Sequence, residues 1–292
     1  MKKILITGAS GYISTHLAAW LGQFKQEYEV TMLSLRGDTW QKESFAGYDV
    51  VVHLAGLAHS KETEQNKALY TQVNRDLTLR VANKAKAEGV GRLLFVSTFN
   101  VYEPKAEHIG RNTPLTPVAA YGKSKLEAEE RLRSLADGGF EVVIVRPPMV
   151  YGPDCPGNFA RLKDLALRCP VFPSLENARS MIYIDNLCEF LRLCPAIPLG
   201  HSHTAVYCPQ NSEYASTREI YTQLRRAAGK KAHVIGCFNP LVRLLARHNG
   251  TFEKVFGNKT CDFALSAPEM KYNRFGFEES IKACVSKDSC YY

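Results

Sequence analysis

Short apolar runs alternate with longer amphipathic segments through the first half of the chain. The runs lack an alternating polar face, which is typical of strands that are buried on both sides in a parallel sheet. They predict strands at residues 3–7, 30–35, 49–54, 92–96 and 141–145. Apolar residues at helical spacing predict helices at residues 12–21, 70–87 and 117–135. This order predicts an α/β protein with a Rossmann-type, doubly wound parallel sheet.

The connections between these elements refine the prediction. Residues 34–49 are too few for a full helix and a further strand, so we expect a loop or one reduced element there. Thr116 is placed as an N-cap before Pro117 at the first helical position, which puts Tyr121 in the second turn of its helix. Proline and glycine cluster at residues 153–158, where we expect the chain to leave the sheet.

Two domains are therefore expected. The first is a dinucleotide-binding domain of residues 1–152, to which a segment at about residues 181–208 returns. The second is a smaller C-terminal substrate lobe of residues 153–180 and 209–292.

A glycine turn follows the first apolar run directly. Residues 8–11 read Gly-Ala-Ser-Gly, between a predicted strand and a predicted helix. Glycine lets the backbone approach a phosphate, and the free N–H groups and dipole at a helix start favour an anion. An ordinary tight turn is the alternative, but the place of this turn in an alternating β/α chain favours a pyrophosphate site. Ser14 stands where the three-glycine pattern has a third small residue, and we expect only a slight adjustment there.

Tyr121 and Lys125 lie one helical turn apart in the third predicted helix. At that spacing the two side chains share one face. A tyrosine has a pKa of about 10, and a fixed ammonium beside it favours the phenolate, which suits the phenol to proton transfer near neutral pH. Thr98, at the end of an apolar run, is placed to hydrogen-bond a substrate oxygen. Because the bare spacing is common on solvated helix faces, the interpretation depends on the rest of the chain.

Six short motifs occur in one order along the chain. They are residues 7–13 (Thr-Gly-Ala-Ser-Gly-Tyr-Ile), 53–56 (His-Leu-Ala-Gly), 73–76 (Val-Asn-Arg-Asp), 96–98 with 101–102, 121–125 (Tyr-Gly-Lys-Ser-Lys) and 146–152 (Arg-Pro-Pro-Met-Val-Tyr-Gly). Together they resemble the extended short-chain dehydrogenase/reductases, specifically the NAD-dependent epimerase/dehydratase group. That group includes UDP-galactose 4-epimerase and nucleotide-sugar 4-keto reductases. The resemblance covers the first half strongly and the remainder loosely.

The resemblance implies roles for individual residues. The implied catalytic residues are Thr98, Tyr121 and Lys125, with Tyr121 as general acid/base and Lys125 as its electrostatic partner. The implied cofactor-binding residues are Gly8, Ser10, Gly11, Tyr12, Ile13, Leu54, Ala55, Gly56, Asn74, Tyr121, Lys125 and Pro148, with Tyr151 and Gly152 lining the nicotinamide end. The implied substrate-binding residues are Thr98, Asn158 and Arg179, the last two for the diphosphate of a nucleotide-sugar. Glu103 replaces a glycine that is usual in the family, in a loop near the substrate.

The end of the second predicted strand bears on the choice between NAD and NADP. NAD sites usually end this strand with a carboxylate that binds the ribose hydroxyls. This chain has Ser34 there and Arg36 two residues later, and both are expected cofactor contacts. A hydroxyl and a guanidinium suit a 2′-phosphate, which favours NADP slightly. In the alternative, Arg36 is solvated and Asp38 binds the ribose.

Composition narrows the class of protein. A hydrophobic content of 45% and a charged content of 23% are ordinary for a globular chain of 292 residues. No apolar stretch is long enough to span a bilayer, and the N-terminus enters a strand, so we expect neither a membrane span nor a cleavable signal. Nine cysteines without paired or metal-like spacing predict reduced thiols in the cytoplasm and no metal site. For Cys155 and for His59, His108, His201 and His203, we expect no catalytic role.

The net charge of +8 raises the possibility of a nucleic-acid partner. The cations are dispersed over several elements and are not interleaved with aromatic residues on one of them. A cationic surface also attracts a nucleotide-sugar and a dinucleotide to a cleft, and small anionic substrates explain the charge better than nucleic acid does.

The expected reaction is hydride transfer at C4 of a UDP-hexose. A 4-epimerase and a 4-keto reductase need nearly the same groups, so both remain open. A dehydratase is disfavoured because Phe99-Asn100, and not an acidic pair, follows Thr98. A catalytically silent cofactor sensor or scaffold of the same fold is the alternative from another class. A homodimer through the helices at residues 70–87 and 117–135 is possible by resemblance only.

Overall fold

The computed structural model describes residues 1–58, 62–237, 239–240, 255–267 and 269–286. His59 lies outside the described residues.

Six parallel strands form the central sheet, in the order β10-β6-β4-β3-β1-β2. They are β1 (Lys2–Thr7), β2 (Tyr28–Leu33), β3 (Val50–His53), β4 (Arg92–Val96), β6 (Glu141–Val145) and β10 (Thr204–Tyr207). The prediction of a parallel sheet is confirmed. The second strand was predicted too late, because its polar start at Tyr28 and Glu29 pairs with Lys2 and Lys3 and carries no apolar signal.

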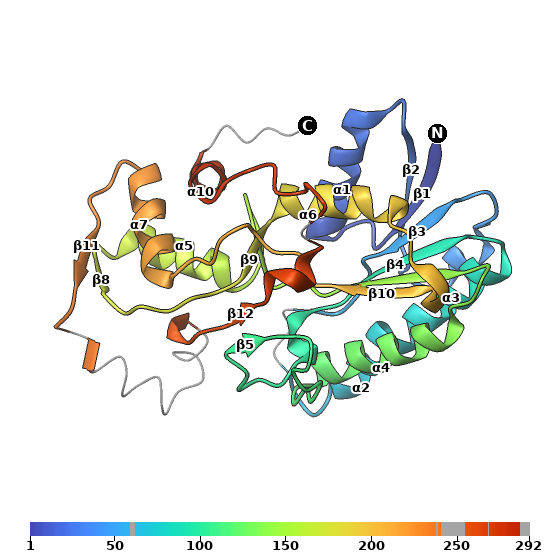
Figure 1. The fold of residues 1–292 in the computed structure, drawn as a ribbon, viewed down its shortest axis with the longest axis horizontal. Coiled ribbons are helices and arrows are strands. Elements are labelled where there is room, and N and C mark those ends of the chain that lie inside the picture. Colours follow the sequence, from blue (N-terminus) through green and yellow to red (C-terminus); the bar gives the residue numbers. More distant parts are fainter. Residues whose placement is uncertain (59–61, 238, 241–254, 268, 287–292) are drawn as a thin grey trace.

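Helices cover both faces of this sheet (Figure 1). Helices α1 (Tyr12–Leu21) and α6 (Ile184–Leu193) pack on one face, against side chains such as Ile4 and Ile6. Helices α3 (Leu77–Ala87) and α4 (Ala120–Leu135) pack on the other, against side chains such as Leu5 and Phe95. Successive strand residues point to opposite faces and both faces are buried, so the strands read as continuous apolar runs. The doubly wound fold class is confirmed.

Two helix starts differ from their predictions. The helix expected at residues 70–87 is a longer assembly of α2 (Lys67–Thr71), a π-helical turn (Gln72–Asp76) and α3. Helix α4 begins at Ala120 after the N-cap residue Ala119. The prediction of Thr116 as N-cap and Pro117 as first helical residue is therefore wrong, and Tyr121 lies in the first turn. The proline signal misled because proline is also favourable in the extended backbone before a helix.

The short connection between β2 and β3 holds only a 3-10 turn, η2 (Thr39–Lys42), as the chain length predicted. Its Trp40 and the following Phe45 are buried against the sheet. The Arg80 guanidinium lies 5.4 Å from the centre of the Trp40 ring. A reduced element thus closes this part of the core.

A group of three helices and three short strand pairs, mostly from the second half of the chain, lies beside the central sheet (Figure 1). Its helices are α5 (Asn158–Arg168), α7 (Thr217–Ala227) and α10 (Phe277–Val285). Its strand pairs are β7 (Met149–Tyr151) with β9 (Met181–Tyr183), β8 (Val171–Pro173) with β11 (His233–Ile235), and β5 (His108–Ile109) with β12 (Thr260–Cys261). Further 3-10 turns are Gly22–Phe24, Phe99–Val101, Cys194–Ala196, Gly200–Ser202 and Phe263–Ser266.

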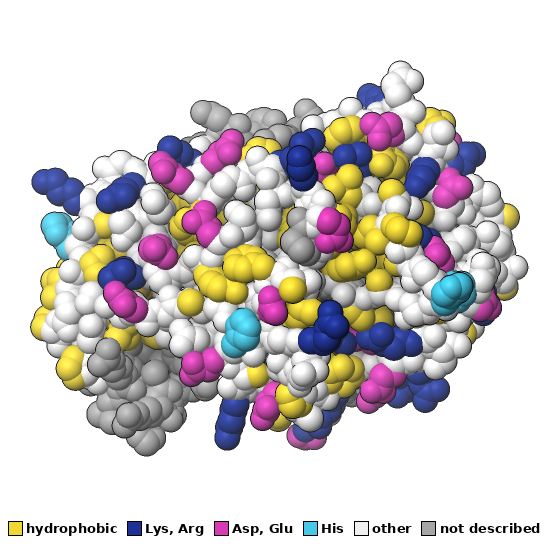
Figure 2. Space-filling view, viewed as in Figure 1, with side chains coloured by type: hydrophobic (Ala, Val, Ile, Leu, Met, Phe, Trp, Pro, Cys, Tyr) yellow, Lys and Arg dark blue, Asp and Glu magenta, His cyan; other side chains and the backbone are white. Residues whose placement is uncertain are grey.

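Two further observations concern the distribution of surface charge and the length of the apolar helices. On the face in Figure 2, Lys and Arg side chains are interspersed with Asp and Glu side chains and form no continuous basic stripe. Within the described ranges, no helix has both the length and the apolar character needed to cross a membrane.

Candidate functional site

The glycine turn joins β1 to α1 and lies against the end of β3. Gly8 has a φ of +91°, and a Cβ atom there would lie 2.7 Å from the backbone nitrogen of Ala55. Gly8 therefore has to be glycine, both for its backbone conformation and for the close approach of β3. Gly11 caps α1 without a side-chain hydrogen bond, and the first turn of α1 holds no acidic residue. Among the residues that the structure describes, no side chain thus accepts the N–H groups that begin α1, which fits a pyrophosphate cradle.

Ser14 fastens this turn. The side chain is fully buried, and its hydroxyl oxygen lies 2.6 Å from Gly8 O and 2.8 Å from Gly11 O, so its single proton is shared between the two carbonyl oxygens. A glycine at this position would leave both contacts unmade. The departure from the three-glycine pattern therefore keeps the close packing and adds a hydrogen-bonded brace.

Asn74 holds the loop that follows β3. The Leu57 backbone N–H donates to Asn74 Oδ1 at 2.7 Å, and Asn74 Nδ2 donates to Leu57 O at 3.1 Å and to Ser124 Oγ at 3.1 Å. Asn74 occupies the π-helical turn, a feature often found at functional sites. A Cβ atom on Gly56 would lie 3.1 Å from Asn74 Oδ1 and 3.3 Å from Lys125 Nζ. The structure thus brings Ala55-Gly56, Asn74 and Lys125 together.

Tyr121 and Thr98 meet at the carboxyl end of β4. Burial raises the pKa of the half-buried Tyr121, and a hydrogen bond with Thr98 opposes that rise. Thr98 Oγ1 also accepts the backbone N–H of Asn100 at 3.2 Å. The structure thus brings Thr98 and Tyr121 together.

Lys125 lies on the buried side of the same helix. Its ammonium donates to Val96 O at 2.9 Å and lies 4.6 Å from the centre of the Phe95 ring. Burial lowers the pKa of Lys125 to about 8. The expectation that Lys125 would lower the pKa of Tyr121 is wrong for this structure, because the net pKa shift of the phenol is upward and the ammonium binds a carbonyl of β4.

Gly122 decides how closely α4 approaches Thr98. A Cβ atom on Gly122 would lie only 2.2 Å from Asn100 O and 2.8 Å from Pro117 Cβ. The helix backbone therefore packs directly on the turn η4 (Phe99–Val101) that follows Thr98. The sequence analysis missed this residue, although a glycine inside a helix, where it costs stability, was a usable signal.

A chain of buried hydrogen bonds connects the glycine turn with Asn74. The His53 ring lies 2.7 Å from Thr7 Oγ1 through Nδ1 and 2.9 Å from Thr78 Oγ1 through Nε2, and Thr78 donates its single proton to Asn74 O at 2.8 Å. Thr78 must therefore accept from Nε2–H, and Thr7 donates to Nδ1. Burial lowers the pKa of His53 to about 3, so the ring is neutral. The motif at residues 53–56 did not predict these hydrogen bonds of His53.

The expected cofactor-selecting residues lie beside the glycine turn. Gly8 N donates to Leu33 O at 2.9 Å, which places Ser34 directly after that contact. Arg36 is exposed. Asp38 accepts from Arg80 at 2.9 Å and from Gln41 at 2.7 Å, and the hydrogen bond from Arg80 lowers the pKa of its carboxyl. The Asp38 carboxylate is thus already engaged by a cation.

The expected substrate residues are on separate elements. Asn158 is exposed at the first position of α5, as predicted. Arg179 precedes β9, and its guanidinium donates to Gly257 O at 2.8 Å. The Glu103 carbonyl accepts from Lys259 Nζ at 3.0 Å, and the same ammonium donates to Pro104 O and Ala106 O. This loop is therefore tied to residues near β12.

Several other expected residues have structural contacts. Tyr151 is buried, with its hydroxyl 2.6 Å from Ser280 Oγ and 2.8 Å from Asn211 Nδ2. Gly152 packs against Tyr12, because a Cβ atom there would lie 2.5 Å from the Tyr12 hydroxyl oxygen. Cys155 is a packed thiol whose pKa is raised by burial. The remaining expected cofactor residues lie around the glycine turn or at the carboxyl ends of β3 and β6; these are Ser10, Ile13, Leu54 and Pro148.

Comparisons with known proteins identify the family of the chain. The family model described as "NAD dependent epimerase/dehydratase family" matches residues 4–196. The chain belongs to that family. The UDP-glucose 4-epimerase of Vibrio cholerae is 31% identical over 261 residues, which cover 78% of this chain and 76% of the relative.

Solved structures share the fold at lower identity. The UDP-glucuronic acid 4-epimerase from Bacillus cereus in complex with NAD has a TM-score of 0.75 at 20% identity, covering 99% of this chain and 100% of that one. The dTDP-4-dehydrorhamnose reductase from Bacillus anthracis in complex with NADP has a TM-score of 0.64 at 19% identity, covering 82% and 86%. Epimerases and reductases of this family thus share one architecture with the present chain.

Proposed function

We propose that the protein is an NAD(P)-dependent nucleotide-sugar 4-epimerase or 4-keto reductase that acts at C4 of a UDP-hexose. The observation that carries the proposal is that Tyr121 on α4 meets Thr98 at the carboxyl end of β4, with Lys125 one helical turn further along α4. Ligands of open α/β sheets bind outside the carboxyl ends of the strands. The glycine turn, with its uncapped helix start, lies at the same edge.

The residues divide the work as follows. Gly8, Gly11 and the first turn of α1 would hold the pyrophosphate of the dinucleotide. When bound, the nicotinamide supplies or accepts the hydride. Tyr121 moves a proton between its phenol oxygen and the sugar oxygen, and Thr98 hydrogen-bonds that oxygen. Because burial raises its pKa, the Tyr121 phenol carries its proton at neutral pH and is ready to protonate a carbonyl that is being reduced.

Two residues support a nucleotide-sugar as the substrate. The Arg179 guanidinium is half-buried, and in the part of the chain that the structure describes its hydrogen bond to Gly257 O leaves further N–H donors for a diphosphate. Asn158, at the start of α5, adds a polar side chain and a helix N-terminus. The relatives named as UDP-sugar epimerases support UDP as the nucleotide.

For the dinucleotide, the arrangement favours NADP slightly. Arg36 is exposed beside Ser34, whereas Asp38 is engaged by Arg80 and Gln41. Titration with NADH and NADPH, followed by the fluorescence of the reduced nicotinamide, measures the preference directly.

The test replaces Tyr121 with Phe and assays the purified protein with UDP-hexoses and with their 4-keto forms. We expect kcat to fall by about 10²–10⁴-fold, as for loss of a general acid–base. Tyr28→Phe is the matched control, because Tyr28 lies at the amino end of β2, on the opposite edge of the sheet. Turnover by Tyr121→Phe equal to that of Tyr28→Phe would refute the proposal.

The same assay separates the two reactions. An epimerase interconverts UDP-hexoses with no added dinucleotide, because the hydride returns to the same sugar. A reductase consumes one reduced dinucleotide for each 4-keto sugar. Binding of dinucleotide without either reaction would support the catalytically silent sensor or scaffold instead.

A further inference from the structure

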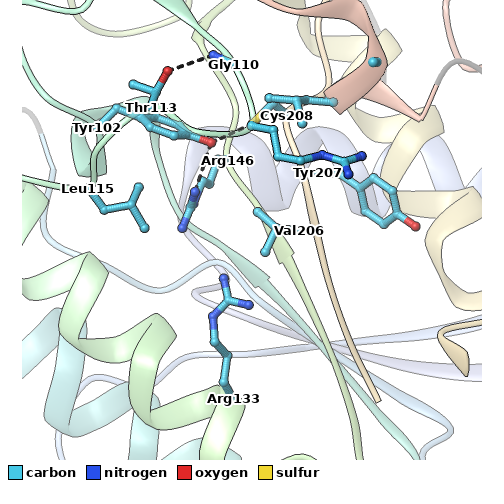
Figure 3. A pocket seen from close by; sticks show the side chains of 12 residues that line it. Tyr102, Gly110, Thr113, Leu115, Arg133, Arg146, Val206, Tyr207 and Cys208 are labelled. Atoms are coloured by element: carbon cyan, nitrogen blue, oxygen red, sulfur yellow. Dashed lines mark hydrogen bonds between the residues drawn. The ribbon is translucent and has the colours of Figure 1, made fainter. Parts of the chain in front are cut away.

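A cavity of about 470 Å³ lies beside the last turn of α4, which contributes Arg133. Its walls come from the loop before α4, the last turn of α4, the end of β10 and the turn at Phe263–Ser266 (Figure 3). None of the residues expected to bind the dinucleotide or the nucleotide-sugar lines it. Ligand sites of proteins commonly have volumes of roughly 300–1,000 Å³, so this cavity has the size for a small molecule.

The walls combine apolar surface with cationic charge. Leu115, Val206 and Leu265 contribute apolar side chains, and the lining residues include no aspartate or glutamate. Three arginines are among the lining residues: Arg111 and Arg133, which are exposed to solvent, and Arg146, which is buried. In Figure 3 the Arg133 side chain rises from α4 toward Val206, below Arg146. An apolar surface with convergent cations fits an anion that has an apolar body.

The three guanidinium groups are not balanced equally. Arg146 is paired with the fully buried Glu129, which lies behind the cavity wall. In the ranges that the structure describes, neither Arg111 nor Arg133 has a carboxylate within ion-pair distance. Burial, together with the nearby positive charge of Arg146, lowers the pKa of Arg133, while Glu129 opposes this shift. An anion between these groups would relieve the repulsion and form charge-assisted hydrogen bonds.

We propose that this cavity is a binding site for a small organic anion that carries one acidic group on an aromatic or aliphatic body. The acidic group binds Arg133 and Arg111, and the body packs on Leu115, Val206 and Leu265. This site is independent of the proposed reaction. Glu129 also accepts the hydroxyl of Ser97, the neighbour of Thr98, so an occupant of the cavity would lie one layer behind the candidate active site.

The test uses 1-anilinonaphthalene-8-sulfonate, whose fluorescence rises on binding, and the full-length protein. Arg133→Gln is expected to weaken binding about tenfold, the effect of losing one charge-assisted hydrogen bond. Arg131→Gln is the matched control, since Arg131 is exposed on the same helix and does not line the cavity. We expect the control to bind within twofold of wild type. The uncharged analogue N-phenyl-1-naphthylamine is expected to bind at least tenfold more weakly than the sulfonate.

Two results would overturn the proposal. The first is equal affinity of Arg133→Gln and Arg131→Gln for the sulfonate. The second is displacement of the sulfonate by NADPH or UDP in competition, which would assign the probe to the nucleotide sites. Matching thermal melting curves of the two variants establish that both are folded.

Discussion

Two buried cations lie along one face of α4 in opposite surroundings: Lys125 on the helix itself, and Arg146 at the end of β6, which pairs with Glu129 one helical turn beyond Lys125. We call these two surroundings the Lys125 flank and the Arg146 flank. Lys125 and Arg146 each expose only 4% of their surface. Arg146, at the end of β6, binds the carboxylate of Glu129 on α4 through Nε and Nη2, and donates to the Tyr102 hydroxyl at 2.9 Å. The Lys125 ammonium contacts the Val96 carbonyl and the face of the Phe95 ring. No ion pair of Lys125 is present among the described residues.

The pKa values follow this difference. Burial lowers the pKa of Arg146, but the hydrogen bond and the charge of Glu129 together raise it by more. The net pKa shift is therefore upward. Burial lowers the pKa of Lys125 to about 8, and the smaller effect of the Glu129 charge opposes this shift. The Arg146 flank therefore holds a fixed charge for structure, whereas the Lys125 flank holds a charge at an energetic cost. Such a cost is typical of a functional site.

Breaking the Arg146 flank should have the largest effect. Glu129→Leu leaves a buried guanidinium unpaired and the Ser97 hydroxyl without its acceptor. We expect the free energy of unfolding to fall by about 3–5 kcal/mol. The double variant Glu129→Leu/Arg146→Met should recover most of that loss, measured by urea denaturation. An exposed ion pair contributes at most about 1 kcal/mol. A free energy of unfolding of Glu129→Leu within that margin of wild type would contradict the comparison.

Removing the Lys125 charge should raise the free energy of unfolding near neutral pH, whereas Glu129→Leu lowers it. The unfolded lysine binds its proton up to about pH 10.5, and the folded one only up to about pH 8. Between these values the unfolded state binds more protons, so stability rises with pH, by roughly 3 kcal/mol in total. Lys125→Met should lack this rise. Denaturation of both proteins from pH 7 to 10.5 measures it, and parallel pH profiles would disprove the assignment.

Gly122 tests the contact between α4 and the turn after Thr98. Gly122→Ala forces a Cβ atom against Asn100 O, and we expect a loss of about 1–3 kcal/mol in stability together with a lower kcat. Gly22→Ala is the control, since no atom lies within 4 Å of a Cβ atom at Gly22. Equal stability and activity of the two variants would show that the helix can move away without consequence.

Ser124→Ala should have the smallest effect. It removes the hydrogen bonds between Ser124 and both Asn74 and the Tyr121 carbonyl, for a loss of about 1 kcal/mol. Because these bonds position the Tyr121 turn, kcat should fall severalfold while KM is unchanged. Ser134→Ala, on the same helix but exposed, is the control and should leave both quantities within error. A change in KM alone would assign Ser124 to substrate binding.

The sequence by itself predicted the features that depend on local pattern. Continuous apolar runs identified five of the six strands of the sheet, because strands buried on both faces leave no polar positions. The glycine turn and the spacing of Tyr121 and Lys125 were visible because phosphate approach and a shared helix face each impose a local constraint.

Tertiary structure alone decided the features that join distant segments. The sixth strand, β10, is identified only by its pairing with β6. Its short apolar sequence resembles many other short apolar sequences in the second half of the chain. The pairing of Arg146 with Glu129, the His53 hydrogen bonds and the contact of Gly122 with Asn100 all cross between elements. The pKa directions of Tyr121 and Lys125 were also beyond the sequence, because desolvation depends on every atom packed around a group and helical spacing fixes only one neighbour.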